Sequence, residues 1–345
     1  MRIGIVNDLP LAVEALTRAL ALNPSCKIAW VARHGAEAVE LCAKDTPDLV
    51  LMDLLMPGMD GVEATRRIMA RSPCAILVVT VSVGANASRV FEAMGHGALD
   101  AVDTPALGRG DPRTSAAPLL SKIDIVARLV GDHDSGAPSA TGSAGLALPA
   151  TRPDRLLAIG ASAGGPAAVA KVLSGLPKDF PAAVVVVQHV DVQFAAGMAD
   201  WLGRDSQLPV RVAREGERPA AGVVLLAGTN DHLTLLAGAQ LGYTPHPREY
   251  VYRPSVDVFF QSVTRHWAGE AVGVLLTGMG RDGAVGLKAL RNQGRYTIAQ
   301  DRASSAVYGM PKAAATLAAA VDILPLDRIA PKLTAVFGGR KLPTI

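Results

Sequence analysis

Short apolar runs alternate with amphipathic segments along the first 130 residues. Apolar runs bounded by turn residues indicate buried strands, and apolar positions three or four residues apart indicate helices. Five such units in succession predict a doubly wound parallel α/β sheet, because parallel strands need a crossover helix between them. The expected strands are 2–7, 28–32, 49–53, 76–80 and 99–102, and the expected helices are 11–22, 36–43, 62–70 and 87–94.

The alternation disappears over residues 131–153, where small residues dominate, and it resumes afterwards. Such a composition predicts a flexible linker. The sequence therefore predicts three parts: a domain over 1–130 that ends in a helical segment, a linker over 131–153, and a second, mainly parallel α/β domain over 154–340. The strands expected there are 156–160, 183–188, 223–227, 272–277 and 296–299, and the helices are 166–173, 256–266, 284–292 and 311–319.

The composition agrees with two globular domains and narrows the function. A chain of 345 residues is too long for one ordinary core, and half of it is hydrophobic. A net charge of +3 without a Lys/Arg run argues against a nucleic-acid binder. Three cysteines without metal-ligand spacing indicate reduced thiols. Because there is no signal-peptide pattern and no apolar stretch near the ~18 residues that cross a bilayer, we expect a cytoplasmic protein without membrane insertion.

Polar residues follow three strands of the first domain. Asp8 comes directly after the first strand, Asp53 ends the third and Thr80 ends the fourth. Ligands of open α/β sheets bind beyond the carboxyl ends of the strands, so we expect these side chains in one pocket. Mg²⁺ would relieve the repulsion between the two carboxylates and leave one oxygen nucleophilic toward a phosphoryl group. The structural alternative is that Asp8 caps the first helix and Asp53 starts a turn.

The run MDLLMPGMDG at residues 52–61, together with Asp8 and Thr80, resembles the phosphoacceptor motif of a response-regulator receiver domain. The resemblance covers about residues 1–130 and implies a flavodoxin-like fold. It also implies that a partner histidine kinase phosphorylates Asp53. The Mg²⁺ ligands it implies are Asp8, Asp53 and the backbone carbonyl of Leu55.

The first domain departs from the receiver pattern at three positions. Asn7 stands where receivers usually carry a second acid, Thr104 where they carry a lysine, and Ala101 where they carry an aromatic switch residue. Asp8 still matches the directly coordinating acid. We therefore expect that Mg²⁺ binds and Asp53 accepts phosphate, with a weakened response to the phosphate.

Three residues suited to nucleophilic catalysis follow strands of the second domain. Ser162 lies in GASAGG at 160–165, a tight strand-to-helix turn that matches the G-x-S-x-G nucleophile elbow, where helix amides can stabilise an oxyanion. His189 follows the strand 183–188 and can serve as its general base. Asp282 follows another strand and can orient the imidazole. The chain order Ser, His, Asp differs from the Ser, Asp, His order of α/β-hydrolases.

A dinucleotide site is the main rival for this half. GMGRDG at 278–283 satisfies the G-x-G-x-x-G fingerprint, and Asp301 follows the next strand. Against it, charged residues occupy the middle of the motif, and Ser162 and His189 stay unexplained. A second alternative is a catalytically inactive partner-binding domain.

Two weaker candidates concern individual residues. Asp257 is a rival third member of the triad, although Ser255 and Asp257 stand where a helix is expected to begin. His232 and His246 suggest a metal, yet no third ligand keeps a regular spacing with them.

Several motifs together resemble the catalytic domain of chemotaxis protein-glutamate methylesterases of the CheB type, over about residues 155–326. They are IGASAGGP at 159–166, QH at 188–189, RPSVD at 253–257, LTGMGRDG at 276–283 and GMPKAA at 309–314. The segments NDLP at 7–10 and MGHGALD at 94–100 also look like the branch that serves surface-sensing Wsp-type pathways.

This resemblance implies hydrolysis of glutamate methyl esters on the cytoplasmic helices of a methyl-accepting chemoreceptor, with release of methanol, and also deamidation of receptor glutamines. The family pattern maps its triad onto Ser162, His189 and Asp282, and makes the backbone N–H of Met279 an oxyanion donor. The implied phosphodonor is a sensor histidine kinase of the CheA type. Mg²⁺ belongs to the receiver, and the esterase needs no cofactor.

Overall fold

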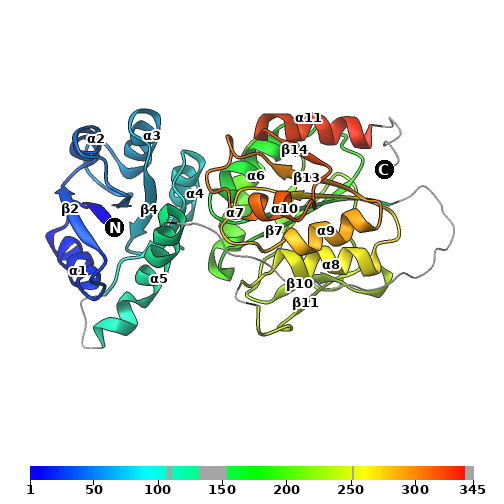
Figure 1. Cartoon of the computed structure of the whole chain (residues 1–345), viewed down its shortest axis with the longest axis horizontal. Helices are drawn as coiled ribbons and strands as arrows, with labels where there is room; N and C mark the ends of the chain where they lie inside the picture. The colour runs from blue at the N-terminus through cyan, green and yellow to red at the C-terminus, as the bar shows by residue number, and fades with distance from the viewer. Residues whose placement is uncertain (107–110, 132–153, 251, 339–345) are drawn as a thin grey trace.

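Two α/β units make up the described part of the chain (Figure 1). The computed structural model describes residues 1–106, 111–131, 154–250 and 252–338. The linker expected over 131–153 lies outside these residues, apart from Gly131 at the end of a helix.

The N-terminal unit is a five-stranded parallel sheet in the order β2-β1-β3-β4-β5. The five predicted strands and the helices between them are confirmed. The strands are β1 (Arg2–Val6), β2 (Lys27–Ala32), β3 (Leu49–Met52), β4 (Ala75–Thr80) and β5 (Asp100–Asp103), and the helices are α1 (Pro10–Ala21), α2 (Gly35–Lys44), α3 (Gly61–Arg71), α4 (Ala87–Gly95) and α5 (Pro112–Gly131).

Helices cover both faces of this sheet because its strands are apolar on both sides. Ile3 and Leu51 pack under α1 and α5, whereas Val50 and Met52, the chain neighbours of Leu51, pack under α2, α3 and α4. Continuous apolar strands of this kind are typical of parallel sheets that are buried on both faces.

The C-terminal unit is a seven-stranded parallel sheet in the order β14-β13-β12-β6-β7-β9-β8, with a separate β10–β11 hairpin. Its strands are β6 (Arg155–Ala161), β7 (Ala183–Gln188), β8 (Val210–Val212), β9 (Val224–Leu226), β10 (His232–Leu235), β11 (Leu241–Thr244), β12 (Glu270–Leu275), β13 (Tyr296–Gln300) and β14 (Asp322–Leu324). Its helices are α6 (Gly165–Ser174), α7 (Val192–Asp205), the 3₁₀ turn η1 (Ala237–Ala239), α8 (Val256–His266), α9 (Ala284–Asn292), α10 (Met310–Thr316) and α11 (Leu326–Phe337).

The strand order places the candidate site at the centre of this sheet. β6 pairs with β7 on one side and with β12 on the other, so the chain reverses direction across the sheet at β6. Crevices of open α/β sheets form at such switch points. Ser162, His189 and the loop that carries Asp282 follow these three adjacent strands.

The sequence pattern did not predict α7, α11, the hairpin strands or the two edge strands. β8 and β14 have three residues each and are only half buried, so they are too short to give a recognisable strand pattern. Gly197 and Gly203 lower the helix propensity of α7. The helix expected over 311–319 ends at Thr316, because Ala318 adopts a left-handed φ of 47°.

Candidate active site

Ser162 lies in a turn whose backbone is held from three sides. Its N–H donates to the carbonyl oxygen of Thr277 at 3.0 Å. Its own carbonyl oxygen accepts from the Gly165 amide at 2.7 Å and from the buried Gln188 Nε2 at 2.8 Å. Ser162 is held, half-buried, just before the start of α6.

Two glycines allow this turn. Gly164 caps α6 with a φ of 72°, a conformation that L residues rarely adopt. A Cβ on Gly278 would lie 2.8 Å from the Ser162 Cβ and 2.2 Å from the Met310 sulfur. The first glycine of the 278–283 motif is therefore explained by its close approach to the serine.

His189 contacts Ser162 on one side and Asp282 on the other. Its Nδ1 is 3.0 Å from the Ser162 Oγ, and its Nε2 is 2.7 Å from the Asp282 Oδ2. The imidazole and the carboxylate are 9% and 5% exposed. We assign the tautomer from these partners: because a carboxylate only accepts, Nε2 carries the proton and the Nδ1 lone pair faces the serine hydroxyl.

The Asp282 carboxylate sits at the N-terminus of α8 and accepts four hydrogen bonds. The donors besides His189 are the Ser255 Oγ (2.7 Å), the Val256 amide (2.7 Å) and the Asp257 amide (3.1 Å). Burial alone would raise the pKa of Asp282, but the hydrogen bonds from His189, Ser255 and Val256 lower it below its usual value. Asp282 therefore stays ionised beside the imidazole.

Three side chains that the sequence did not predict as site residues support this arrangement. Tyr252 stacks on His189, with ring centroids 4.4 Å apart and an interplanar angle of 10°. Ser255, which the sequence placed only at a helix start, is the N-cap of α8 and also donates to Asp282. The fully buried His232 accepts the Ser255 N–H at Nδ1 and contacts the Pro247 carbonyl through Nε2. The RPSVD motif at 253–257, which contains Ser255, was the sequence feature that could have indicated such a supporting role.

The rival candidates have other structural roles. Asp257 accepts from the Gly286 amide at 2.6 Å and does not contact His189. Burial, and then the charge of Asp282, raise the pKa of Asp257 to about 7. Asp301, the acid of the dinucleotide alternative, accepts from the amide and hydroxyl of Ser304 in its own loop. Both His232 ring nitrogens have partners, so neither is available to a metal.

The three residues of the expected phosphoacceptor site also follow adjacent strands. Asp8 follows β1, Asp53 follows β3 and Thr80 ends β4. The N-cap of α1 is Leu9, so the alternative in which Asp8 caps that helix is wrong. Burial, and then the nearby Asp8, raise the pKa of Asp53 to about 6.

These residues fit a hard divalent cation. The Oδ1 of Asp8 is buried and has no hydrogen-bond partner among the residues that the structure describes. A cation between Asp8 and Asp53 would satisfy that oxygen and favour ionisation of Asp53. Asn7 is buried and accepts from the Leu9 amide at 2.9 Å, so it forms a local turn. Thr104 donates its backbone N–H to the Thr80 carbonyl.

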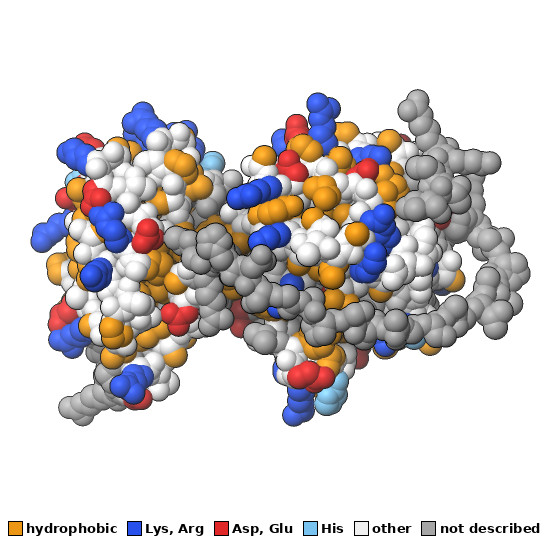
Figure 2. Space-filling view, in the orientation of Figure 1, with side chains coloured by type: hydrophobic (Ala, Val, Ile, Leu, Met, Phe, Trp, Pro, Cys, Tyr) orange, Lys and Arg blue, Asp and Glu red, His pale blue; other side chains and the backbone are white. Residues whose placement is uncertain are grey.

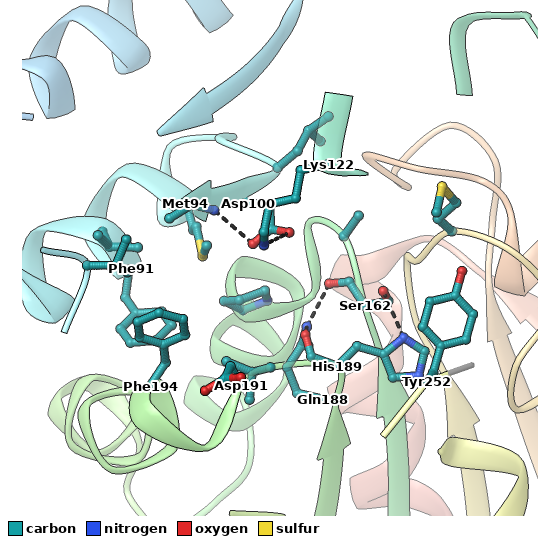
Figure 3. A pocket seen from close by; sticks show the side chains of 18 of the residues that line it. Phe91, Met94, Asp100, Lys122, Ser162, Gln188, His189, Asp191, Phe194 and Tyr252 are labelled. Carbon is teal, nitrogen blue, oxygen red and sulfur yellow. Dashed lines mark hydrogen bonds and ion pairs between the residues drawn. The ribbon is translucent and has the colours of Figure 1, made fainter. Parts of the chain in front are cut away.

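A cleft of about 610 Å³ opens at the candidate triad and is lined by both α/β units (Figure 3). Ser162, His189 and Tyr252 line one side, and Phe91 and Met94 of α4 line the other. Lys122 and Asp100 form an ion pair at its edge (Figure 3). Met279 also lines the cleft, and its amide has no acceptor within the described ranges. Where side chains are visible beside this junction, basic and acidic residues both occur among hydrophobic ones (Figure 2).

Two protein-family models match the chain: the response regulator receiver domain over residues 3–107 and the CheB methylesterase over residues 157–333. No helix in the part that the structure describes is long and apolar enough to cross a membrane.

Relatives match almost the whole length. A Pseudomonas aeruginosa protein named protein-glutamate methylesterase/protein-glutamine glutaminase 3 is 64% identical over 98% of this chain and 100% of its own. A Cupriavidus metallidurans protein named protein-glutamate methylesterase/protein-glutamine glutaminase 2 is 64% identical over 98% and 99%. The crystal structure of the Thermotoga maritima CheB methylesterase catalytic domain covers 54% of this chain and 100% of that chain, with 32% identity and a TM-score of 0.51. This chain therefore belongs to the CheB methylesterase family and carries a response regulator receiver domain at its N-terminal end.

Proposed function

We propose that the protein is a phosphorylation-regulated protein-glutamate methylesterase. Its substrate is the glutamate methyl ester on the cytoplasmic helices of a methyl-accepting chemoreceptor, and its products are receptor glutamate and methanol. Deamidation of receptor glutamines follows from the same acyl-transfer chemistry. The observation that carries the proposal is the hydrogen-bonded chain from the Ser162 Oγ through His189 to Asp282, at 3.0 and 2.7 Å.

In this mechanism the Nδ1 of His189 takes the Ser162 proton as the hydroxyl attacks the ester carbonyl. Asp282 stabilises the resulting imidazolium, while Tyr252 holds its ring plane. The backbone N–H of Met279, a residue that lines the same cleft, is the proposed donor to the oxyanion. The imidazolium returns its proton to the leaving methoxide. A water that His189 activates then releases the glutamate.

Regulation follows from the cleft that both units line. We propose a receiver domain over 1–130, a linker over 131–153 and a catalytic domain over 154–340. A sensor histidine kinase of the CheA type transfers phosphate to Asp53 in the cytoplasm. Asp8, Asp53 and the Leu55 carbonyl would hold Mg²⁺, which neutralises charge during that transfer. In the unphosphorylated protein, α4 of the receiver lines the cleft opposite Ser162 and blocks it.

Methanol release from methylated receptor membranes tests the function. We expect release that depends on the protein and increases with a small phosphodonor and Mg²⁺, together with conversion of receptor methyl esters to glutamates by mass spectrometry. A chain that begins near residue 152 should be more active than the unphosphorylated full chain. No methanol above the protein-free rate would contradict the esterase, and equal or lower activity of the shortened chain would contradict inhibition by the receiver.

A further inference from the structure

The receiver helix α4 packs against two helices of the catalytic unit, α6 and α7, which also pack against each other (Figure 1). α6 begins three residues after Ser162, and α7 begins three residues after His189. The groove between these two helices therefore starts at the proposed nucleophile and its base. Pro166 of α6 and Phe194 of α7 line the same cleft as Ser162 and His189.

The seam between α4 and α7 has the form of a close helix–helix contact. A Cβ on Gly197 would lie 2.8 Å from the Ala87 Cβ, and one on Gly95 would lie 3.3 Å from the Trp201 ring. Phe91 packs on Trp201, with ring centroids 5.9 Å apart. Small residues at such positions let two helix backbones approach, and the aromatic rings fill the space beside them.

The contacting residues of α7 recur with helical spacing. Phe194, Gly197, Trp201 and Arg204 lie three or four residues apart and so share one face. Phe194 lines the cleft at the end near His189, and at the far end Arg204 donates to the Ser88 hydroxyl at 2.8 Å. One face of α7 thus contacts α4 along its whole length, from the end near His189 to the last turn of α7.

Side chains of a helix in this groove reach the catalytic cleft. Phe91 and Met94 project from α4 into the cleft that Ser162 and His189 line (Figure 3). A helix in the same position that carried a glutamate methyl ester would extend that ester into the same space.

We propose that the groove between α6 and α7 is the docking site for the receptor helix that carries the methyl ester, and that α4 occupies it in place of that helix. The inference rests on the proposed methylesterase function and adds where the substrate binds. It makes inhibition competitive: α4 and the receptor helix exclude each other because both need Gly197 and Trp201.

Two matched variants of the full-length protein separate this proposal from simple obstruction. Trp201→Ala changes the groove, and Phe91→Ala changes only the helix that fills it. Phe91→Ala should raise receptor demethylation by the unphosphorylated chain, because it weakens the contact between α4 and α7 and leaves the groove intact. Trp201→Ala should raise it less, because it weakens the contact of α4 and that of the receptor helix together. After phosphorylation with acetyl phosphate and Mg²⁺, only Trp201→Ala should raise the KM for methylated receptor, by about tenfold, as is usual when a central interface aromatic is removed.

Hydrolysis of 4-nitrophenyl acetate reports the triad without the groove. It should be unchanged in phosphorylated Trp201→Ala and lost in Ser162→Ala. A phosphorylated Trp201→Ala chain with the wild-type KM for receptor would overturn the proposal, because α7 would then serve only to hold α4. A wild-type chain that releases no methanol from receptor would instead overturn the methylesterase function itself.

Gly197→Leu gives an independent test should Trp201→Ala fail to fold. A leucine improves helix propensity and fills the seam. It should exclude α4 and the receptor helix alike, so the phosphorylated chain should show a raised KM for receptor. A folded, phosphorylated Gly197→Leu chain with the wild-type KM for receptor would overturn the proposal here as well.

Discussion

Replacing Asp282 with asparagine removes one charge from the proposed triad and keeps its shape. The carboxylate has two donors on each oxygen: Val256 and His189 on Oδ2, and Ser255 and Asp257 on Oδ1. An asparagine can place its carbonyl oxygen on the Oδ2 side and keep both 2.7 Å bonds. Its NH₂ group then faces the Ser255 hydroxyl, which can rotate to accept, and loses only the 3.1 Å bond from the Asp257 amide.

In that orientation His189 keeps the tautomer that faces Ser162, so the loss of rate is electrostatic. The difference between a charged and a neutral hydrogen-bond partner is about 1–2 kcal/mol. A full charge 2.7 Å from the imidazolium contributes at most about 6 kcal/mol at an effective dielectric constant near 20. Since about 1.4 kcal/mol is tenfold in rate, we expect Asp282→Asn to lower kcat/KM by about 100- to 1,000-fold.

Initial rates of methanol release give kcat/KM, and a thermal melt shows that the variant is folded. Asp257→Asn is the matched control, because this neighbouring carboxyl already has a pKa near 7 and does not contact His189. It should stay within a few-fold of wild type. A folded Asp282→Asn protein with a kcat/KM within twofold of wild type would refute the role given to the carboxylate charge.

Two further predictions concern the phosphoacceptor and the ring that covers His189. The pKa of Asp53 is raised from 3.8 to about 6, so its ionisation disfavours the folded state, and the free energy of unfolding should fall as pH rises from about 4 to 6. Without Mg²⁺, Asp53→Asn should therefore be more stable than wild type at pH 8, by at most about 3 kcal/mol, and thermal melts across pH measure it. Tyr252→Phe preserves the stack on His189 and should keep near-wild-type kcat, whereas Tyr252→Ala should lose up to about tenfold in methanol release.

Each of these predictions has a clear contrary result. Identical pH profiles of stability for wild type and Asp53→Asn would show that ionisation of Asp53 does not destabilise the folded protein. Added Mg²⁺ should narrow the difference by stabilising wild type alone, and equal stabilisation of both proteins would argue against a cation at Asp53. Equal loss in Tyr252→Phe and Tyr252→Ala would place the role of Tyr252 in its hydroxyl rather than in the stack.

The sequence predicted the positions of the candidate site residues better than those of the residues that support them. Ser162, His189 and Asp282 each follow an apolar run, and the rule that ligands bind beyond strand ends was enough to place them together. The same rule placed Asp8, Asp53 and Thr80. The strand order then put β6 between β7 and β12, which makes the first three residues neighbours.

The residues that support the candidate triad lie on elements whose positions the alternation of apolar and amphipathic segments does not predict. Tyr252 and Ser255 reach the triad from a connection between an unpredicted hairpin and α8. Asp282 accepts from the first turn of α8, a contact between segments more than 20 residues apart. The sequence pattern did not predict α7. It therefore could not predict the groove between α6 and α7, against which α4 packs.

The measurement that tests the central claim most directly is methanol release from methylated receptor by Ser162→Ala, beside Ser174→Ala at the other end of α6. Both proteins should be phosphorylated and matched to wild type by thermal melt. We predict that Ser162→Ala loses at least about 1,000-fold in kcat, as is usual when a catalytic nucleophile is removed, and that Ser174→Ala retains the wild-type rate. A folded Ser162→Ala protein that releases methanol near the wild-type rate would contradict the account.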